Sequence, residues 1–220
     1  MKRFLCLISV FALLLCTAAC AGSEDKQNDG PFYEEFPTGD EIFTVILEKN
    51  PQATITMSDG SKIVIELSYD SAPNTVSSFI AYANADIYNE LVFARAMINY
   101  KNENFCINTG LADGIYVAPF FTLGEIENNP ITHSRGVITM NPTESGNLSG
   151  LFSIMTKDTA YYDGQCAPFG KIIEGMDVVD KIASMEKDED GKIVEPLKIT
   201  SVEIEMFDQE IPDPTIIRND

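Results

Sequence analysis

The sequence has little of what most hydrolytic and metal-dependent sites are built from. It contains one histidine, His133, in 220 residues. Zinc and iron sites with several histidines are therefore excluded, and only one imidazole could act as the base for a serine or cysteine nucleophile. His133 stands directly before Ser134, but adjacency in sequence does not bring a base onto a nucleophile. We therefore interpret His133 as a structural residue.

Positive charge is equally scarce. Lysine and arginine total 15 against 34 aspartates and glutamates, and the formal net charge is -19. Such a chain would repel a phosphate backbone, which excludes nonspecific nucleic-acid binding. Residues 164–171 lack the spacing of a phosphate-binding loop, and the acidic turn 188–191 lacks the glutamate that closes a calcium loop. We therefore predict no metal and no cofactor, and we interpret 188–191 as a solvated acidic turn.

The apolar run near the N-terminus is short. Residues 4–15 fall below the roughly 20 apolar residues that a bilayer-spanning helix needs. Lys2 and Arg3 precede the run and small residues follow it up to Cys20, which is typical of a secretion signal. The same small residues resemble the cleavage box of a bacterial lipoprotein. We predict a signal peptide over 1–19 and lipidation of Cys20, with a plain cleaved secretion signal as the alternative.

Lipidation would make the chain an extracytoplasmic, membrane-anchored lipoprotein. Its negative charge excludes electrostatic attraction to an anionic membrane surface, so the lipid alone would hold it there. Residues 20–40 are polar, carry several glycines and prolines, and are interpreted as a tether. A folded domain is predicted over 41–206, followed by an irregular acidic tail over 207–220.

The domain has the pattern of a mainly β fold with two helices. Asp59-Gly60 separates two alternating runs and predicts a hairpin. Apolar residues at helical spacing predict one helix that begins at Pro73 and a second over 176–183. The predicted strands are 53–57, 62–67, 91–97, 105–109, 136–140, 151–155, 167–173 and 199–206, with a weaker candidate at 43–47. Many short strands and two isolated helices favour a closed antiparallel barrel with helical plugs.

The order of these segments resembles that of the cyclophilins, a family of prolyl isomerases, from about residue 53 to 205. Residues 65–76 resemble the family's opening strand and helix, and Phe93-Ala94-Arg95 resembles its Phe-His-Arg strand. Residues 136–140 resemble its Gly-x-Leu-x-Met strand, and the most specific likeness covers 169–179. The resemblance implies a mainly β fold, a closed eight-stranded antiparallel cyclophilin-like barrel capped by two α-helices.

The resemblance also implies a reaction that needs few functional groups. Rotation about an X-Pro amide must cross a barrier of about 18–20 kcal/mol, and a hydrogen-bond donor aimed at the twisted state lowers it. In the family an arginine supplies that donor beside an apolar socket for the proline ring, and Arg95 matches this catalytic arginine. Neither a metal nor a titrating base takes part, so the single histidine is no obstacle.

The same likeness assigns the substrate-binding positions, and several of them depart from the family. The positions are Phe93, Phe105, Cys106, Asn108, Asn141, Leu151, Ser153, Tyr161, Tyr162 and Cys166. Ser153 stands where a phenylalanine floors the socket, Leu151 where a glutamine is usual, and Cys166 where a histidine is usual. Losing the floor aromatic would remove about 1–3 kcal/mol of apolar contact with a proline ring. Segment 96–104 is also longer than in the family.

Two functions stay open on this sequence. The first is a prolyl isomerase that assists the folding of exported proteins. Its partners would be proline-containing segments of those proteins, and the departures at the socket would lower its activity. The second is a noncatalytic cyclophilin-like module that binds peptides or a partner at the cell surface. We expect a monomer in either case.

Two thiols remain in the mature chain besides Cys20. Both Cys106 and Cys166 match positions that line the family's pocket. Because disulfides persist in exported proteins, the two could form a disulfide or a redox-responsive pair. The alternative, which is the commoner situation, is two unrelated buried thiols.

Overall fold

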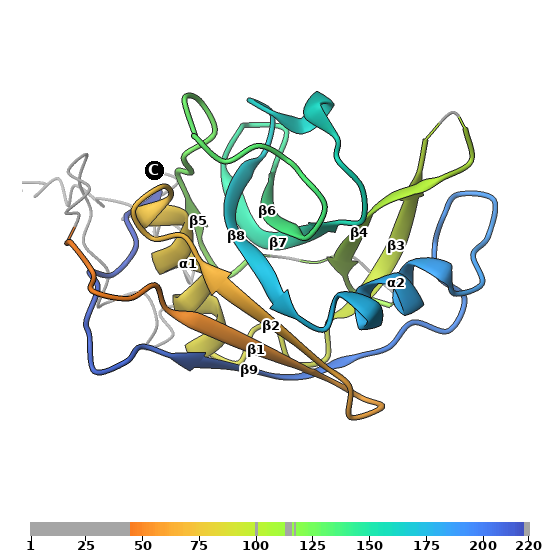
Figure 1. Ribbon diagram of the computed structural model, residues 1–220, viewed down its shortest axis with the longest axis horizontal. Helices are drawn as coiled ribbons and strands as arrows, with labels where there is room; N and C mark the ends of the chain where they lie inside the picture. Colours follow the sequence, from red (N-terminus) through yellow and green to blue (C-terminus); the bar gives the residue numbers. More distant parts are fainter. Residues whose placement is uncertain (1–44, 100, 113–115, 117, 218–220) are drawn as a thin grey trace, which may run out of the picture. The chain divides into compact units, whose positions relative to one another are not determined.

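The computed structural model describes residues 45–99, 101–112, 116 and 118–217, and Figure 1 shows how their elements are arranged. The predicted signal peptide, Cys20 and nearly all of the predicted tether and domain start lie outside the described residues. No helix within these described ranges is long and apolar enough to cross a membrane.

Antiparallel strands make up most of the fold. The strands found in the described residues are β1 (Gln52–Met57), β2 (Lys62–Leu67), β3 (Val92–Ile98), β4 (Asn104–Gly110), β5 (Phe121–Thr122), β6 (Val137–Pro142), β7 (Leu148–Met155), β8 (Ala167–Glu174), β9 (Ile199–Glu205) and β10 (Ile216–Ile217). Eight of them pair in the order β9-β1-β2-β8-β6-β7-β4-β3, and every neighbouring pair is antiparallel. These eight are the strands that the alternating sequence pattern predicts.

The sheet curls, and its two end strands meet only where β9 begins. Val92 and Lys198 form an isolated bridge. The Glu90 N–H donates to the Ile199 carbonyl, and the Ile199 N–H donates to the Leu91 carbonyl. The mainly β fold of eight antiparallel strands with two helices is thus confirmed. Its ends are joined by a short contact instead of a full ladder of hydrogen bonds.

Helix α1 (Pro73–Asn84) begins with a proline at a position where the missing N–H is not needed. The residue before it, Ala72, has no side chain that could cap the helix. A carboxylate from a distant segment does so instead: Glu125 accepts hydrogen bonds from the N–H groups of Asn74 (2.7 Å) and Thr75 (3.1 Å). Negative charge is favourable at a helix N-terminus. The start of α1 is therefore set by a tertiary contact.

Helix α1 also supplies a side chain at the centre of the core, Phe79. It packs against β7, β8 and β9, while α2 (Met176–Ser184) packs against β2, β3 and β4. The Phe79 side chain is completely buried. Its ring centroid lies 5.0 Å from that of Tyr88, 5.1 Å from Phe169 and 5.7 Å from Phe152. Aromatic rings at these separations attract each other beyond the area that they bury.

Two short strands, β5 and β10, are absent from the sequence-based prediction. Ile216 pairs with Thr122, and Thr122 pairs with Leu148 of β7. The segment predicted as an irregular tail therefore returns to the sheet, although most of it has neither helix nor strand. Strands of two residues are too short to show a period. The weaker candidate strand at 43–47 is not seen in its described part, where Ile46 is 95% exposed.

Segment 96–104, which is long for the family, lengthens a hairpin. Its ends continue β3 and β4, which extend together from the rest of the sheet in Figure 1. Asn99 closes the turn, since its Oδ1 accepts from the N–H groups of Lys101 (2.8 Å) and Glu103 (3.1 Å). The insertion thus leaves the pairing of β3 with β4 intact.

Replacing Phe79 by alanine should leave a cavity between four elements of the core. We expect Phe79→Ala to lower the free energy of unfolding by about 3–5 kcal/mol. Urea denaturation followed by circular dichroism measures this. Tyr161→Ala is the matched control, because that aromatic side chain is 75% exposed and should lose little. Equal losses in the two variants would contradict the assignment of the core.

Candidate functional site

Arg95 faces outward because β3 contains a bulge. Phe93 pairs with Thr109 and Arg95 pairs with Asn108, so Ala94 is an extra residue between two consecutive partners on β4. In a regular strand, residues two apart share a face, and a bulge re-aims the side chain that follows it. The Phe93 side chain is completely buried, and its ring lies 6.0 Å from that of Phe152. Arg95 is exposed.

This corrects the role that the resemblance implied for Phe93. The resemblance places it among the substrate-binding positions, although a phenylalanine in such a strand is more often a core residue, and the structure shows it in the core. The same bulge keeps the catalytic candidate on the opposite face of the sheet.

A row of polar side chains continues from Arg95 across the neighbouring strands. Arg95 pairs with Asn108, and Asn108 pairs with Ser153 of β7. Directly opposite residues on antiparallel strands share a face. Ser153 Oγ donates to Asn141 Oδ1 (2.9 Å), and Cys106 Sγ donates to Asn108 Oδ1 (3.1 Å). The two amides are thereby held in place by neighbours on the sheet.

A pocket of about 750 Å³ opens beside Arg95. Four of the predicted site residues line it together, namely Arg95, Asn108, Asn141 and Leu151. The other lining residues are Ala94, Thr109, Gly110, Leu111, Ala112, Tyr116, Ala118, Phe121, Pro142, Thr143, Ser149 and Lys192. A cavity of this size, lined both by apolar residues and by side chains that can hydrogen-bond, suits a small ligand or a short piece of peptide.

Three residues that line this pocket are absent from the predicted site. Tyr116 and Phe121 come from a segment in which no family pattern is recognisable, and the Tyr116 hydroxyl donates to the Ser149 carbonyl (3.1 Å). Lys192 follows the turn that was interpreted as a solvated acidic one. No local signal could have found these residues, because only the pairing of distant segments brings them to Arg95.

Ser153 hydrogen-bonds to Asn141 of the pocket lining, and three of the other candidates, Phe105, Cys106 and Tyr162, belong to an aromatic and thiol cluster. Cys106 and Met155 belong to its buried centre, and Phe105 and Tyr162 pack against that centre with their ring centroids 5.9 Å apart. Cys106 is completely buried, and Ser153 is 1% exposed. These two side chains cannot touch a ligand unless their neighbours move. The predicted site therefore comprises an open pocket and an adjoining aromatic and thiol cluster, linked by the hydrogen bond between Cys106 and Asn108.

The tyrosines lie on the short helix η1 (Ala160–Tyr162), at the edge of that cluster. Tyr161 is exposed and stands edge-on to Tyr162, with ring centroids 5.9 Å apart. Tyr162 is half-buried, and its carbonyl accepts a hydrogen bond from the Cys166 N–H (3.3 Å). Cys166 is buried directly behind it.

The two thiols are free and protonated at neutral pH. Cys106 and Cys166 form no disulfide with each other. Burial raises the pKa of Cys106 to about 12, against a smaller opposing effect of a hydrogen bond with the Tyr162 side chain. Burial raises the pKa of Cys166 to about 11. Because the thiolate is the reactive form, neither thiol is primed for oxidation. The structure therefore agrees with the alternative of two buried thiols, although both contact Tyr162.

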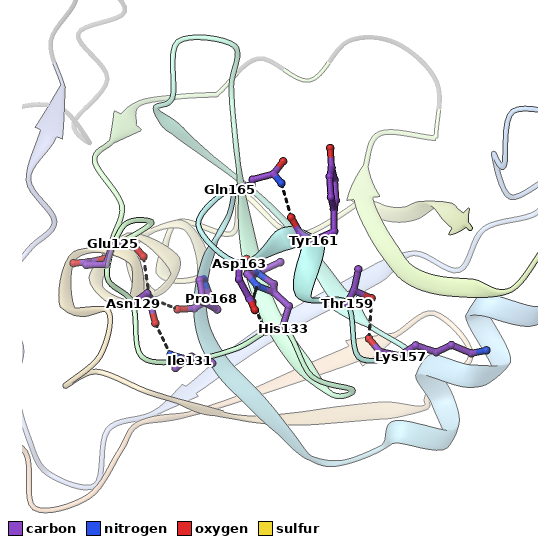
Figure 2. A network of polar contacts seen from close by, with 11 residues as sticks. Glu125, Asn129, Ile131, His133, Lys157, Thr159, Tyr161, Asp163, Gln165 and Pro168 are labelled. Carbon is purple, nitrogen blue, oxygen red and sulfur yellow. Dashed lines mark hydrogen bonds and ion pairs between the residues drawn. The ribbon is translucent and has the colours of Figure 1, made fainter. Parts of the chain in front are cut away.

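His133 connects η1 to β6. As Figure 2 shows, its imidazole lies against the carboxylate of Asp163, with 2.7 Å between Nδ1 and Oδ1. The same oxygen accepts from the His133 backbone N–H (2.8 Å), and Nε2 lies 3.0 Å from Thr139 Oγ1. The hydrogen bonds from the backbone N–H and then the imidazole of His133 lower the pKa of Asp163. His133 therefore fixes the turn that carries Tyr162, which is the structural role predicted for it.

Asn129 ties down the chain before His133. Its Nδ2 donates to the carbonyls of Glu125 (2.8 Å) and Pro168 (2.9 Å), and its Oδ1 accepts from the Ile131 N–H (3.0 Å). Figure 2 shows these contacts beside the His133 cluster. One long connection is thus fixed both to α1, through Glu125, and to the site.

Comparison with known proteins agrees with this architecture. The model of the family described as cyclophilin type peptidyl-prolyl cis-trans isomerase/CLD matches residues 52–204. A peptidyl-prolyl cis-trans isomerase of Helicobacter pylori is 32% identical over 159 residues, which are 70% of this chain and 90% of that protein. Peptidyl-prolyl cis-trans isomerase B of Bacillus subtilis is 29% identical over 129 residues, 58% of this chain and 87% of that protein.

Solved structures show the same fold. A cyclophilin type peptidyl-prolyl cis-trans isomerase of Cryptosporidium parvum superposes with a TM-score of 0.59 at 18% identity, covering 71% of this chain and 98% of that one. A second structure of that protein, determined in the presence of the dipeptide Ala-Pro, superposes with a TM-score of 0.58 at 19% identity, covering 70% and 98%.

The carboxylate of Asp163 should make the free energy of unfolding depend on pH under acidic conditions. Its pKa is lowered in the folded state, so its stabilising effect is present above its ordinary pKa of about 3.9 and is lost as pH falls through the lowered value. We expect the free energy of unfolding to decline more steeply below about pH 4 in the wild type than in Asp163→Asn. Urea denaturation at a series of pH values measures both slopes, with Asp70→Asn, an exposed aspartate, as control. Parallel slopes in wild type and Asp163→Asn would contradict this expectation.

Proposed function

The chain belongs to the cyclophilin-type peptidyl-prolyl cis-trans isomerase family, and from this membership we propose that Arg95 makes it a working prolyl isomerase. The observation that carries the proposal is the position of Arg95. A bulge turns it out of the core, and its side chain lines an open pocket with Asn108 and Asn141. A guanidinium at such a place is a fixed donor of hydrogen bonds beside bound peptide.

The proposed mechanism is electrostatic and involves no covalent step. When the X-Pro amide twists, it loses resonance and the proline nitrogen gains a lone pair. A donor that meets this lone pair only in the twisted state lowers the barrier without tightening binding of the planar substrate. Arg95 would be that donor. Asn108 and Asn141 would hydrogen-bond the peptide backbone and keep the bond to be rotated next to the guanidinium.

The substrates proposed are proline-containing segments of polypeptides. The likeness to a structure determined in the presence of Ala-Pro supports this class. Because Ser153 replaces the floor aromatic and is itself buried, the proline ring would find less apolar contact than in the family, and activity would be lowered.

A second candidate, a noncatalytic peptide-binding module, is favoured by one feature. Cys106 and Ser153, at two of the socket positions, are buried, while the pocket beside Arg95 stays open. Such a surface could bind the backbone of an extended peptide without enclosing its proline ring.

We further propose that the chain acts outside the cytoplasm as a lipoprotein that assists the folding of exported proteins. The charged start, the apolar run and the small residues before Cys20 support this. Two or more acyl chains on Cys20 would anchor a protein that its charge keeps off anionic membranes. The polar segment 20–40 would leave the domain free to reach its clients.

Removing the guanidinium should abolish most of the turnover. We expect Arg95→Ala to lower kcat/KM for an X-Pro tetrapeptide about a hundredfold in a protease-coupled assay, the usual cost of losing a preorganised donor. Arg135→Ala is the matched control, since Arg135 is bound to Asp180 and lies outside the pocket. A folded wild type that binds the peptide but does not turn it over would contradict the isomerase and favour the module.

The anchor can be tested in the full chain. We expect the protein expressed in a bacterium to fractionate with membranes and to incorporate labelled palmitate, and Cys20→Ser to be released and unlabelled. A wild type that is secreted in soluble form would contradict the lipoprotein and support a plain signal peptide.

A further inference from the structure

We propose that the acidic turn at residues 188–191 is a positioning element for Arg95, with Asp188 as its key side chain. The proposal rests on the function proposed above and names a residue that acts through the catalytic arginine. It gives a role to a turn that the sequence marked only as acidic and solvated.

The segment that includes this turn lies against β3 on both sides of Arg95. The Ile193 N–H donates to the Ala94 carbonyl (2.9 Å), and the Ala96 N–H donates to the Gly191 carbonyl (3.0 Å). Between them, Arg95 and Lys192 form an isolated bridge. The bulged part of β3 is therefore held on its free edge by this segment, opposite to β4.

The turn also contacts the guanidinium itself. Arg95 Nη1 donates to the carbonyl of Asp190 (3.2 Å). A carbonyl that accepts from one end of a planar guanidinium restrains the group, while the other N–H groups remain available to a ligand. The position of the Asp190 carbonyl thus limits the orientations that the Arg95 donor can take.

Asp188 builds the turn that presents this carbonyl. Its Oδ1 accepts from the N–H groups of Asp190 (3.0 Å) and Lys192 (2.9 Å). Its backbone N–H donates to the Lys192 carbonyl (2.9 Å), and its carbonyl accepts from the Gly191 N–H (3.1 Å). An aspartate or asparagine side chain that binds backbone N–H groups ahead of it is a common way to fix a turn.

Gly191 is required by the same geometry. Its φ is +77°, which strains other residues, and a Cβ at this position would lie 3.0 Å from the Ala96 carbonyl oxygen. The close approach of the turn to β3 therefore needs glycine. Asp188 and Gly191 together place the Asp190 carbonyl within hydrogen-bond distance of the Arg95 guanidinium.

The role of Asp188 depends on an acceptor oxygen and not on its charge. Asparagine offers the same Oδ1 to the same two N–H groups. Asp188→Asn should therefore keep the turn, whereas Asp188→Ala should lose it. This pair of variants separates positioning from any electrostatic effect of a carboxylate.

The test compares Asp188→Ala, Asp188→Asn and Asp59→Ala in the protease-coupled assay. We expect Asp188→Ala to lower kcat about fivefold, the worth of one hydrogen bond, with KM unchanged because the guanidinium acts in the twisted state. Asp188→Asn should retain the wild-type kcat. Asp59→Ala is the matched control, since Asp59 also accepts from a backbone N–H of its own turn, that of Ser61 between β1 and β2, and its other partner is Lys181 of α2. A wild-type kcat in Asp188→Ala, or an equal loss in Asp188→Asn, would overturn the proposal.

A second measurement does not depend on turnover. The 15N relaxation of the Arg95 Nε–H group, assigned by its loss in Arg95→Lys, reports how rigidly the guanidinium is held. We expect greater mobility in Asp188→Ala than in the wild type and Asp188→Asn. Equal mobility in all three would overturn the positioning role even in an active enzyme. An inactive wild type with the expected mobility change would instead contradict the isomerase and leave the positioning role standing.

Discussion

The bulge at Phe93–Arg95 is the constraint on which the site depends. One additional residue in β3 places an aromatic ring in the core and a guanidinium on the outer face, although the two are only two positions apart. Burial of Phe93 against Phe152 holds the strand from within. The hydrogen bonds of segment 191–193 hold the same strand along its edge. The outward direction of Arg95 is therefore fixed by packing on one side and backbone pairing on the other.

The site is divided into two parts with different chemistry. The pocket beside Arg95 offers amide and guanidinium groups that can bind and orient a peptide backbone. In the neighbouring cluster, Phe105 and Tyr162 pack over buried Cys106. Burial keeps both thiols protonated, so this cluster contributes packing and no reactive group. In the proposed mechanism, catalysis depends on the first part and affinity for the proline ring on the second.

Long-range polar contacts place the segments that carry few apolar residues. Glu125 caps α1, Asn129 joins the same connection to β8, and His133 binds Asp163, which directly follows Tyr162. Each of these side chains binds groups that are far away in sequence. A connection without helix or strand can therefore have a defined position, because its backbone and side chains are hydrogen-bonded at several points.

The sequence alone was sufficient for the eight strands and the two helices, because alternation and helical spacing are local patterns. The catalytic role of Arg95, which the Phe-x-Arg stretch implies, stays a prediction. The sequence did not reveal β5 and β10, which are too short to show a period, or the bulge between Phe93 and Arg95, since a bulge leaves no mark in the spacing. Nor could it assign Tyr116, Lys192 or Asp188 to the site. Their roles arise from pairing between distant segments, and only the tertiary structure decides which backbone edges meet.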